Sequence, residues 1–332
     1  MFIFPKKTKL MKINLLGFLL FSILIISCKQ SKEAPFVFNK KSLLENFKIL
    51  SSDSLEGRGF SKPGNYKAQQ YIAAEFKKIG LQTISDSSFI QAFPYTFSGI
   101  KKQRLFPVLN AGYDSLNPTD TTVIGGNVLG QIQGEINKTI VITAHLDHLG
   151  IKNQQIYNGA DDNASGTAAL FAIAQYFKKN RPKHRLIFAA VDAEEIGSLG
   201  ADYFLKNYTD KENIVLNINM DMIAQNDSMQ LYAAGLHHYP QLITPLENLN
   251  SPINLLFGHD TPGDQIKEDW TFSSDHRIFH EEKIPFIYFG VEDHKDYHKP
   301  SDTFEKVNQQ FYTAAIELII QAIDNYDAFL DK

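Results

Sequence analysis

The chain has 332 residues, of which 43% are hydrophobic and 21% are charged, a composition typical of a globular protein and not of a disordered or fibrous one. Its formal net charge is −4, and the 33 basic residues are spread along the chain instead of being gathered in one stretch. Because phosphate binding needs clustered cations, the sequence argues against nucleic acid as the main partner.

The N-terminus has the pattern of an export signal. Four lysines precede an apolar run over residues 13–26, which is too short for a comfortable membrane span but has the size of a signal-peptide core. The run ends in Ser27 and Cys28, an arrangement that resembles a bacterial lipoprotein cleavage box. A plain signal peptide with an incidental cysteine is the alternative.

We therefore expect residues 1–27 to be a lipoprotein signal peptide and residues 28–38 to be a tether. Acyl chains on Cys28 would anchor the exported protein to the bacterial cell envelope, on the periplasmic or the cell-surface side of a membrane. Cys28 is the only cysteine, so no disulfide forms within the chain. The remaining residues, 39–332, are expected to form one domain.

Within this domain, residues 65–79 read as an amphipathic helix that Gly80 ends. From residue 139 onwards, short apolar strands alternate with helices. The expected strands are 139–144, 186–191, 214–218 and 286–289, and the expected helices are 166–178 and 199–206. Strands that are apolar throughout belong to a sheet covered on both faces, so the fold class is α/β, a three-layer sandwich. Ligands of such sheets bind beyond the carboxyl ends of the strands.

Acidic residues and histidines follow each of these strands. The residues concerned are His145, Asp147 and His148 after the first strand, Glu194 and Glu195 after the second, Asp221 after the third, His298 after the last, and Asp161 and Asp162 at the entrance to a helix. Each has an ordinary structural interpretation by itself, as a helix cap, a turn residue or a solvated helix start. Together, so many carboxylates repel one another unless cations join them, and imidazole with carboxylate suits zinc.

Six ordered motifs carry a resemblance to a known family: AHLDH, GADDNASG, VDAEEIGSLGA, NINMDMI, SDHRIF and YHKPSDT. This set resembles the co-catalytic zinc exopeptidases of metallopeptidase family twenty-eight, which include aminopeptidases and glutamate carboxypeptidases. The resemblance implies a phosphorylase/hydrolase-like α/β/α fold with a mixed central sheet and two zinc ions. It assigns His145 and Asp221 to one ion, Glu195 and His298 to the other, and Asp162 to both.

The resemblance also implies an activity, a zinc aminopeptidase that removes N-terminal residues from short peptides. Glu194 would be the general base for a water molecule shared by the two ions, and Asp147 would orient His145. We expect Tyr297 to stabilise the developing oxyanion, and Asp275 and His276 to line the substrate pocket together with His148. His294 is a rival to His298, which we prefer because it lies in the His-x-Pro-x-Asp-Thr pattern.

Three other activities remain open. A carboxypeptidase or dipeptidase of the same family would need an arginine for the substrate carboxylate, and only Arg58 and Arg277 are placed to serve. Glutaminyl cyclase shares the fold but typically uses one zinc ion. A peptide-binding lipoprotein without catalysis is the non-enzymatic alternative. The sequence indicates no oligomeric state.

Overall fold

The computed structural model describes residues 1–2, 38–84, 88–97, 121–264 and 267–330. Cys28 and all but the first two residues of the expected signal peptide lie outside these residues, as does all but the last residue of the expected tether. The chain separates into two units, Met1–Phe36 and Val37–Lys332, and the second contains every element discussed below. No helix in the described part of the chain is long and apolar enough to cross a bilayer.

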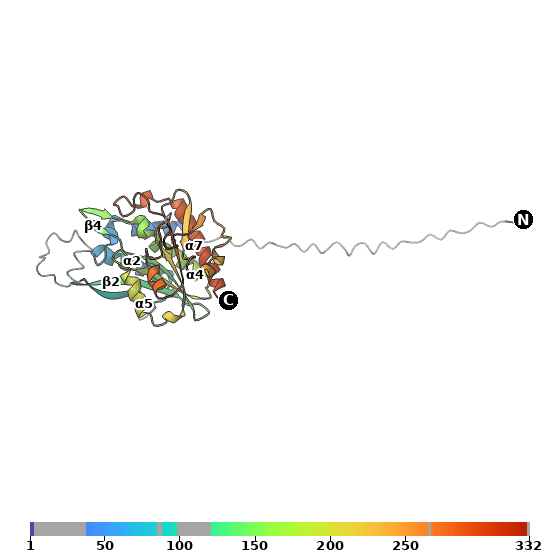
Figure 1. Ribbon diagram of the computed structural model, residues 1–332, viewed down its shortest axis with the longest axis horizontal. Coiled ribbons are helices and arrows are strands. Elements are labelled where there is room, and N and C mark those ends of the chain that lie inside the picture. Colours follow the sequence, from blue (N-terminus) through green and yellow to red (C-terminus); the bar gives the residue numbers. More distant parts are fainter. Residues whose placement is uncertain (3–37, 85–87, 98–120, 265–266, 331–332) are drawn as a thin grey trace. The chain divides into compact units, whose positions relative to one another are not determined.

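Helices and strands alternate through most of this unit (Figure 1). The α-helices are α1 Lys40–Leu50, α2 Pro63–Ile79, α4 Gly166–Lys179, α5 Leu199–Asn207, α6 His276–Glu281 and α7 Gln309–Phe329. The strands are β1 Ile90–Phe97, β2 Thr121–Ile132, β3 Thr139–His145, β4 Gly150–Lys152, β5 Gln155–Tyr157, β6 Arg185–Val191, β7 Ile214–Met220, β8 Gln230–Ala234, β9 Asn254–Phe257 and β10 Phe286–Gly290. The elements expected from the sequence agree with these bounds to within two residues.

One mixed sheet of eight strands forms the centre of the unit, in the order β1-β2-β6-β3-β7-β10-β8-β9. The four central strands β6, β3, β7 and β10 are parallel. On one side β2 pairs antiparallel with β6, and on the other β8 pairs antiparallel with β10. Strands β4 and β5 form a separate hairpin. The carboxyl ends of the four central strands therefore meet at one edge, which is where ligands of such sheets bind.

Helices cover both faces of the sheet, as the apolar strands require. On β3, Ile140 and Ile142 pack into a core shared with α1, α2, α4 and α7, while Val141 between them packs into a second core shared with α5 and α6. This alternation follows from the two-residue period of a strand, whose successive side chains point to opposite faces. The predicted three-layer α/β/α sandwich with a mixed sheet is confirmed.

Local sequence explains where the helices begin and end. Helix α2 has Pro63 in its first turn and ends at Gly80, whose φ of 86° lies in the left-handed region that glycine adopts without strain. Helix α7 starts after Asn308, whose side chain accepts a hydrogen bond from the N–H of Phe311.

Candidate metal centre

Two groups of potential metal ligands lie at the carboxyl edge of the central strands. Residue His145 is the last of β3, and Asp221 directly follows β7. Asp162 lies in the turn Ala160–Ser165 that leads into α4, and Glu195 follows β6. His298 comes from the loop after β10. Residues far apart in the chain therefore meet at one place because parallel strands deliver them to the same edge.

The first group consists of His145, Asp162 and Asp221. The Nε2 atom of His145 lies 3.1 Å from Oδ1 of Asp162 and 3.2 Å from Oδ1 of Asp221. Ligands of a tetrahedral zinc ion, at bond lengths near 2.0–2.1 Å, are about 3.3 Å from one another. All three side chains are buried. The spacing therefore suits one metal ion among the three donors.

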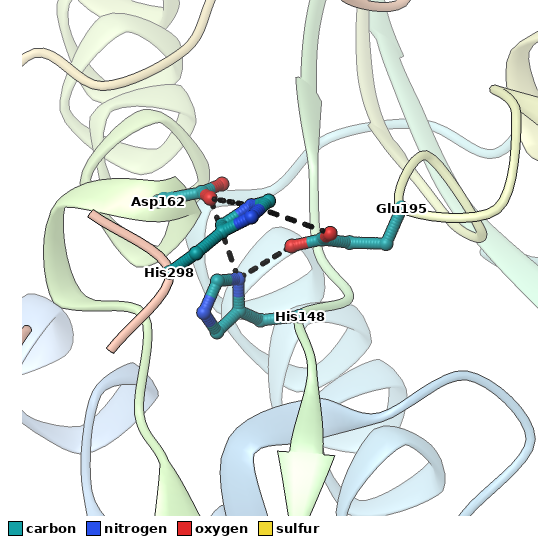
Figure 2. Close-up of side chains that lie close together, drawn as sticks. All are labelled: His148, Asp162, Glu195 and His298. Carbon is teal, nitrogen blue, oxygen red and sulfur yellow. Dashed lines mark ion pairs between the residues drawn. The ribbon is translucent and has the colours of Figure 1, made fainter. Parts of the chain in front are cut away.

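The second group consists of His148, Asp162, Glu195 and His298, shown in Figure 2. The Nε2 atom of His298 lies 3.0 Å from Oδ2 of Asp162 and 3.5 Å from Oε2 of Glu195. Asp162 thus offers Oδ1 to the first group and Oδ2 to the second. A carboxylate arranged in this way can bridge two metal ions.

His148 belongs to this second group, whereas the sequence led us to expect it only in the pocket wall. Its Nδ1 atom lies 2.6 Å from Oε1 of Glu195 and 3.5 Å from Oδ2 of Asp162. The HLDH motif places a second histidine near the strand end, which is a possible sign of a further ligand. Nothing in the sequence shows, however, whether a side chain three residues beyond a strand end turns toward the site.

Asp162 is held by its own turn and by a distant loop. Asp302, in the His-x-Pro-x-Asp-Thr pattern, accepts hydrogen bonds from the backbone N–H groups of Asp161 and Asp162 at 3.0–3.2 Å. The side chain of Asn163 donates to the carbonyl of Met220 at the end of β7. These contacts fix Asp162 between the two strand ends.

Asp147 connects the histidine to the glutamate loop. The Nδ1 atom of His145 lies 3.0 Å from the backbone carbonyl of Asp147 and 3.7 Å from its Oδ1. The same carboxylate accepts hydrogen bonds from the backbone N–H groups of Glu194 and Glu195, at 3.0 and 3.4 Å. Asp147 therefore positions the ligand histidine chiefly through its backbone, and the two glutamates through its side chain.

The acids and histidines of the centre perturb one another's pKa values. Burial would raise the pKa of Asp162, but the three neighbouring histidines lower it well below 3.8. Burial would lower the pKa of His145, yet Asp221 and Asp162 raise it well above 6.5. In addition, Nδ1 of His148 and Oε1 of Glu195 are buried without a hydrogen-bond partner. A divalent cation would coordinate both of these atoms, and imidazole with carboxylate is a ligand set that suits zinc, so the residues fit zinc.

Two further side chains border the centre. Burial raises the pKa of Glu194 well above its usual value, although the neighbouring His145 lowers it. The ring of Tyr297 stacks on that of His298 with centroids 4.0 Å apart. Burial, together with Asp162 and Asp221, raises the pKa of the Tyr297 hydroxyl, which therefore stays protonated and able to donate a hydrogen bond.

Not every expected residue is accessible or belongs to a ligand group, although Asp275 lies close enough to interact electrostatically with His145 and Asp221. Asp275 and His276 have no exposed surface, so neither touches a substrate in this conformation, contrary to our expectation. The ring of His276 is within hydrogen-bonding distance of the Trp270 carbonyl, and burial lowers its pKa to about 3. His294, the rival of His298, lies 3.1 Å from Asp161 and outside both groups of potential ligands.

Arg58 was a candidate for binding a substrate carboxylate, and the structure contradicts this. Its side chain is buried, and its guanidinium donates to the backbone carbonyls of Leu50, Leu146, Asn158 and Gly159. It has no surface left for a ligand. The other candidate, Arg277, donates to the carbonyl of Gly197.

Comparison with known proteins now identifies the family. The sequence pattern described as peptidase family M28 matches residues 127–323, more than half of the chain. The chain belongs to peptidase family M28. Every residue in the two groups of potential ligands falls within this stretch.

Individual M28 relatives agree with this assignment. Aminopeptidase YwaD of Bacillus subtilis (strain 168) is 26% identical over 199 residues, which cover 55% of this chain and 40% of YwaD. The matched part spans less than half the length of curated relatives such as YwaD.

Solved structures show the same fold. BSAP, a zinc aminopeptidase from Bacillus subtilis, superposes with a TM-score of 0.63 at 18% identity, covering 89% of this chain and 96% of BSAP. Glutaminyl cyclase from Fimbriiglobus ruber gives a TM-score of 0.64 at 17% identity, covering 87% of this chain and 96% of the cyclase. Because one fold carries both activities, the site must decide between them.

Proposed function

We propose that this M28 protein is an aminopeptidase that uses two zinc ions to remove N-terminal residues from short peptides. The observation that carries the proposal is the pair of ligand groups that share Asp162, each with donor spacings suited to one ion. The relatives YwaD and BSAP, an aminopeptidase and a zinc aminopeptidase, support the choice of reaction and metal.

The residues divide the chemistry among them. When bound, zinc supplies Lewis acidity, which makes water nucleophilic near neutral pH. Glu194 accepts the proton of the attacking water and returns it to the departing amine, a role that a carboxylate beside the two groups of potential ligands can fill. Glu195 serves as a ligand, so the two adjacent glutamates have separate tasks. The Tyr297 hydroxyl donates a hydrogen bond to the carbonyl oxygen as negative charge develops on it.

Charge around the centre supports recognition of an amine over a carboxylate. Arg58 is buried and fully used by backbone carbonyls, which leaves no bidentate fork for a C-terminal carboxylate from that position. Two exposed carboxylates, Glu292 and Asp293, follow β10 on the loop that carries His298. These two carboxylates would favour a protonated peptide N-terminus, although the same loop also carries the exposed Lys295 and Lys299.

The ligand sets also favour peptide hydrolysis over glutaminyl cyclisation. A cyclase of this fold typically uses one zinc ion, and the chain retains His145 and Asp221 in the first group together with the full second group.

The decisive experiment compares an aminoacyl-anilide with its N-acetylated form, using enzyme reconstituted with zinc. We expect rapid release of the aniline from the free amine and little from the blocked substrate. Equal turnover of both would refute the aminopeptidase assignment. Cyclisation of a peptide with N-terminal glutamine, without hydrolysis, would favour the cyclase. Zinc content measured on the same sample, expected to be two ions per chain, tests the metal assignment separately.

The location of the protein stays a prediction from the sequence. We propose that Cys28 carries the lipid that anchors the exported enzyme to the cell envelope, with the catalytic unit facing away from the cytoplasm. The support is the charged and apolar pattern before Cys28 and the fact that the chain has no other cysteine.

A further inference from the structure

We propose that His148 is a fourth protein ligand of the second metal ion, which makes the two ions unequal. The proposal rests on the proposed di-zinc function and extends it. The second ion would be held by His148, Asp162, Glu195 and His298, and the first by only three residues.

The contact between His148 and Glu195 is too close to be incidental and lacks the alignment of a hydrogen bond. The Nδ1 atom lies 2.6 Å from Oε1 of Glu195, yet neither atom has a hydrogen-bond partner. A hydrogen bond needs the ring N–H directed at its acceptor, and this one is directed elsewhere. A buried nitrogen and a buried carboxylate oxygen without partners are costly, and a cation bound between them satisfies both.

The position of Nδ1 also fits the remaining donors of this group. Nδ1 lies 3.5 Å from Oδ2 of Asp162, and the ring centroids of His148 and His298 are 5.7 Å apart. Figure 2 shows both rings and both carboxylates turned toward a common centre. Donor separations of 2.6–3.5 Å in this group bracket the value of about 3.3 Å for a tetrahedral zinc ion.

Packing holds the His148 ring in this position. A Cβ atom on Gly159 would lie 2.4 Å from Cδ2 of His148 and 2.5 Å from its Cγ, so only glycine leaves room for the ring there. The backbone N–H of His148 donates to the carbonyl of Arg58 at 3.3 Å. Since the side chain is 1% exposed, its orientation is set by the fold before any metal binds.

The inequality of the two sites has a consequence for function. A site with four protein donors resembles a closed structural site, whereas a site with three keeps one coordination position open. We therefore infer that the ion in the second group is retained more tightly, and that the open position for water and substrate belongs to the group of His145, Asp162 and Asp221.

The test measures zinc binding to metal-free protein in competition with a chromophoric chelator, for wild type and for His148→Asn. Asparagine places an amide nitrogen near the position of Nδ1, so it keeps a hydrogen-bond donor for Glu195 but is a poor zinc ligand. We expect wild type to bind two ions with different affinities, and His148→Asn to weaken the tighter one by more than about 100-fold. Loss of an outer hydrogen bond costs only about 10–100-fold.

Two further variants complete the design. His148→Asp has the same shape as His148→Asn. Its carboxylate oxygen can bind zinc but cannot donate a hydrogen bond to Glu195, so this variant should retain more zinc affinity than His148→Asn. His184→Asn is the matched control, because it removes another fully buried histidine, which directly precedes β6 and pairs with Asp327, outside both ligand groups. It should leave both zinc affinities unchanged. Melting of each metal-free variant, followed by circular dichroism, checks that the fold is kept.

A zinc affinity of His148→Asn within about 100-fold of wild type, or above that of His148→Asp, would overturn the proposal and make His148 a hydrogen-bond donor to Glu195. If no His148 variant folds, binding of cobalt to wild type decides the question. A paramagnetic proton NMR spectrum of the cobalt-loaded protein that shows only one imidazole N–H signal from the tighter site would then refute it. Wild-type protein that binds no zinc, or binds two ions without hydrolysing peptides, would instead refute the proposed function.

Discussion

Replacement of Arg58 tests whether this buried cation holds the metal centre together. Its guanidinium donates to four backbone carbonyls at 2.6–2.9 Å: that of Leu50 at the end of α1, that of Leu146 after β3, and those of Asn158 and Gly159 before the Asp162 turn. Burial lowers the pKa of Arg58 to about 10, against the raising effect of Asp162 and other nearby acids, so the group stays charged at neutral pH.

The expected loss of stability follows from the number of backbone carbonyls to which the Arg58 side chain donates a hydrogen bond. Arg58→Met leaves the carbonyls of Leu50, Leu146 and Asn158 without a donor, whereas that of Gly159 keeps the N–H of Ala164. At about 1–3 kcal/mol for each of the three, the loss is about 3–9 kcal/mol in total. A typical domain has a free energy of unfolding of about 5–15 kcal/mol, so the loss is comparable to the whole stability. Arg58→Lys keeps the charge but not the planar fork, and we expect a loss of about 2–4 kcal/mol.

Urea unfolding of metal-free protein, followed by circular dichroism, measures these losses. Arg185→Met is the matched control, because Arg185 is partly exposed and pairs with Asp210 at the other end of the strands, where about 1 kcal/mol or less is expected. The reasoning would be refuted if Arg58→Met unfolded at the same urea concentration as Arg185→Met.

Two other predictions concern the general base and a distant ion pair. Glu194→Gln should retain both zinc ions by metal analysis and lose turnover of an aminoacyl-anilide by about 10²–10⁴-fold, whereas loss of zinc would show that Glu194 is a ligand. At the far end of the sheet, burial would raise the pKa of Asp327, but hydrogen bonds from His184 and the N–H of Lys183 lower it overall. Because its folded pKa lies below the unfolded value near 3.9, this carboxylate stabilises the fold above that pH and stops doing so as pH falls through the folded pKa. Asp327→Asn should therefore unfold at lower urea than wild type at pH 7, and the difference should shrink below pH 4. A difference that is the same at pH 7 and pH 3 would contradict this.

The match between expected and observed elements has a physical basis in local patterning. The run over residues 139–144 is apolar and β-branched, so it reads as a buried strand without knowledge of its neighbours, and it is β3. The spacing of apolar residues before Gly80 and the capping role of that glycine likewise belong to α2 alone. Such signals depend on residues within a few positions of one another.

The site shows the limit of that reasoning. The sequence assembled His145, Asp162, Glu195, Asp221 and His298 into one centre through the order of the strands and the family resemblance, and the structure brings these five side chains together. The sequence could not show that Asp275 and His276 are buried, because their burial depends on how α6 packs against the sheet.

The sequence by itself therefore determined the layered α/β fold, the edge of the sheet that carries the site, and the kind of ligands found there. Only the tertiary structure decided that His148 turns toward Glu195 and that Arg58 faces inward to backbone carbonyls. The reason is that both directions are fixed by contacts across the fold. The His148 ring rests on Gly159, and Arg58 reaches carbonyls up to 101 positions away in the chain. The spacing of apolar residues along the chain gives no information about such long-range contacts.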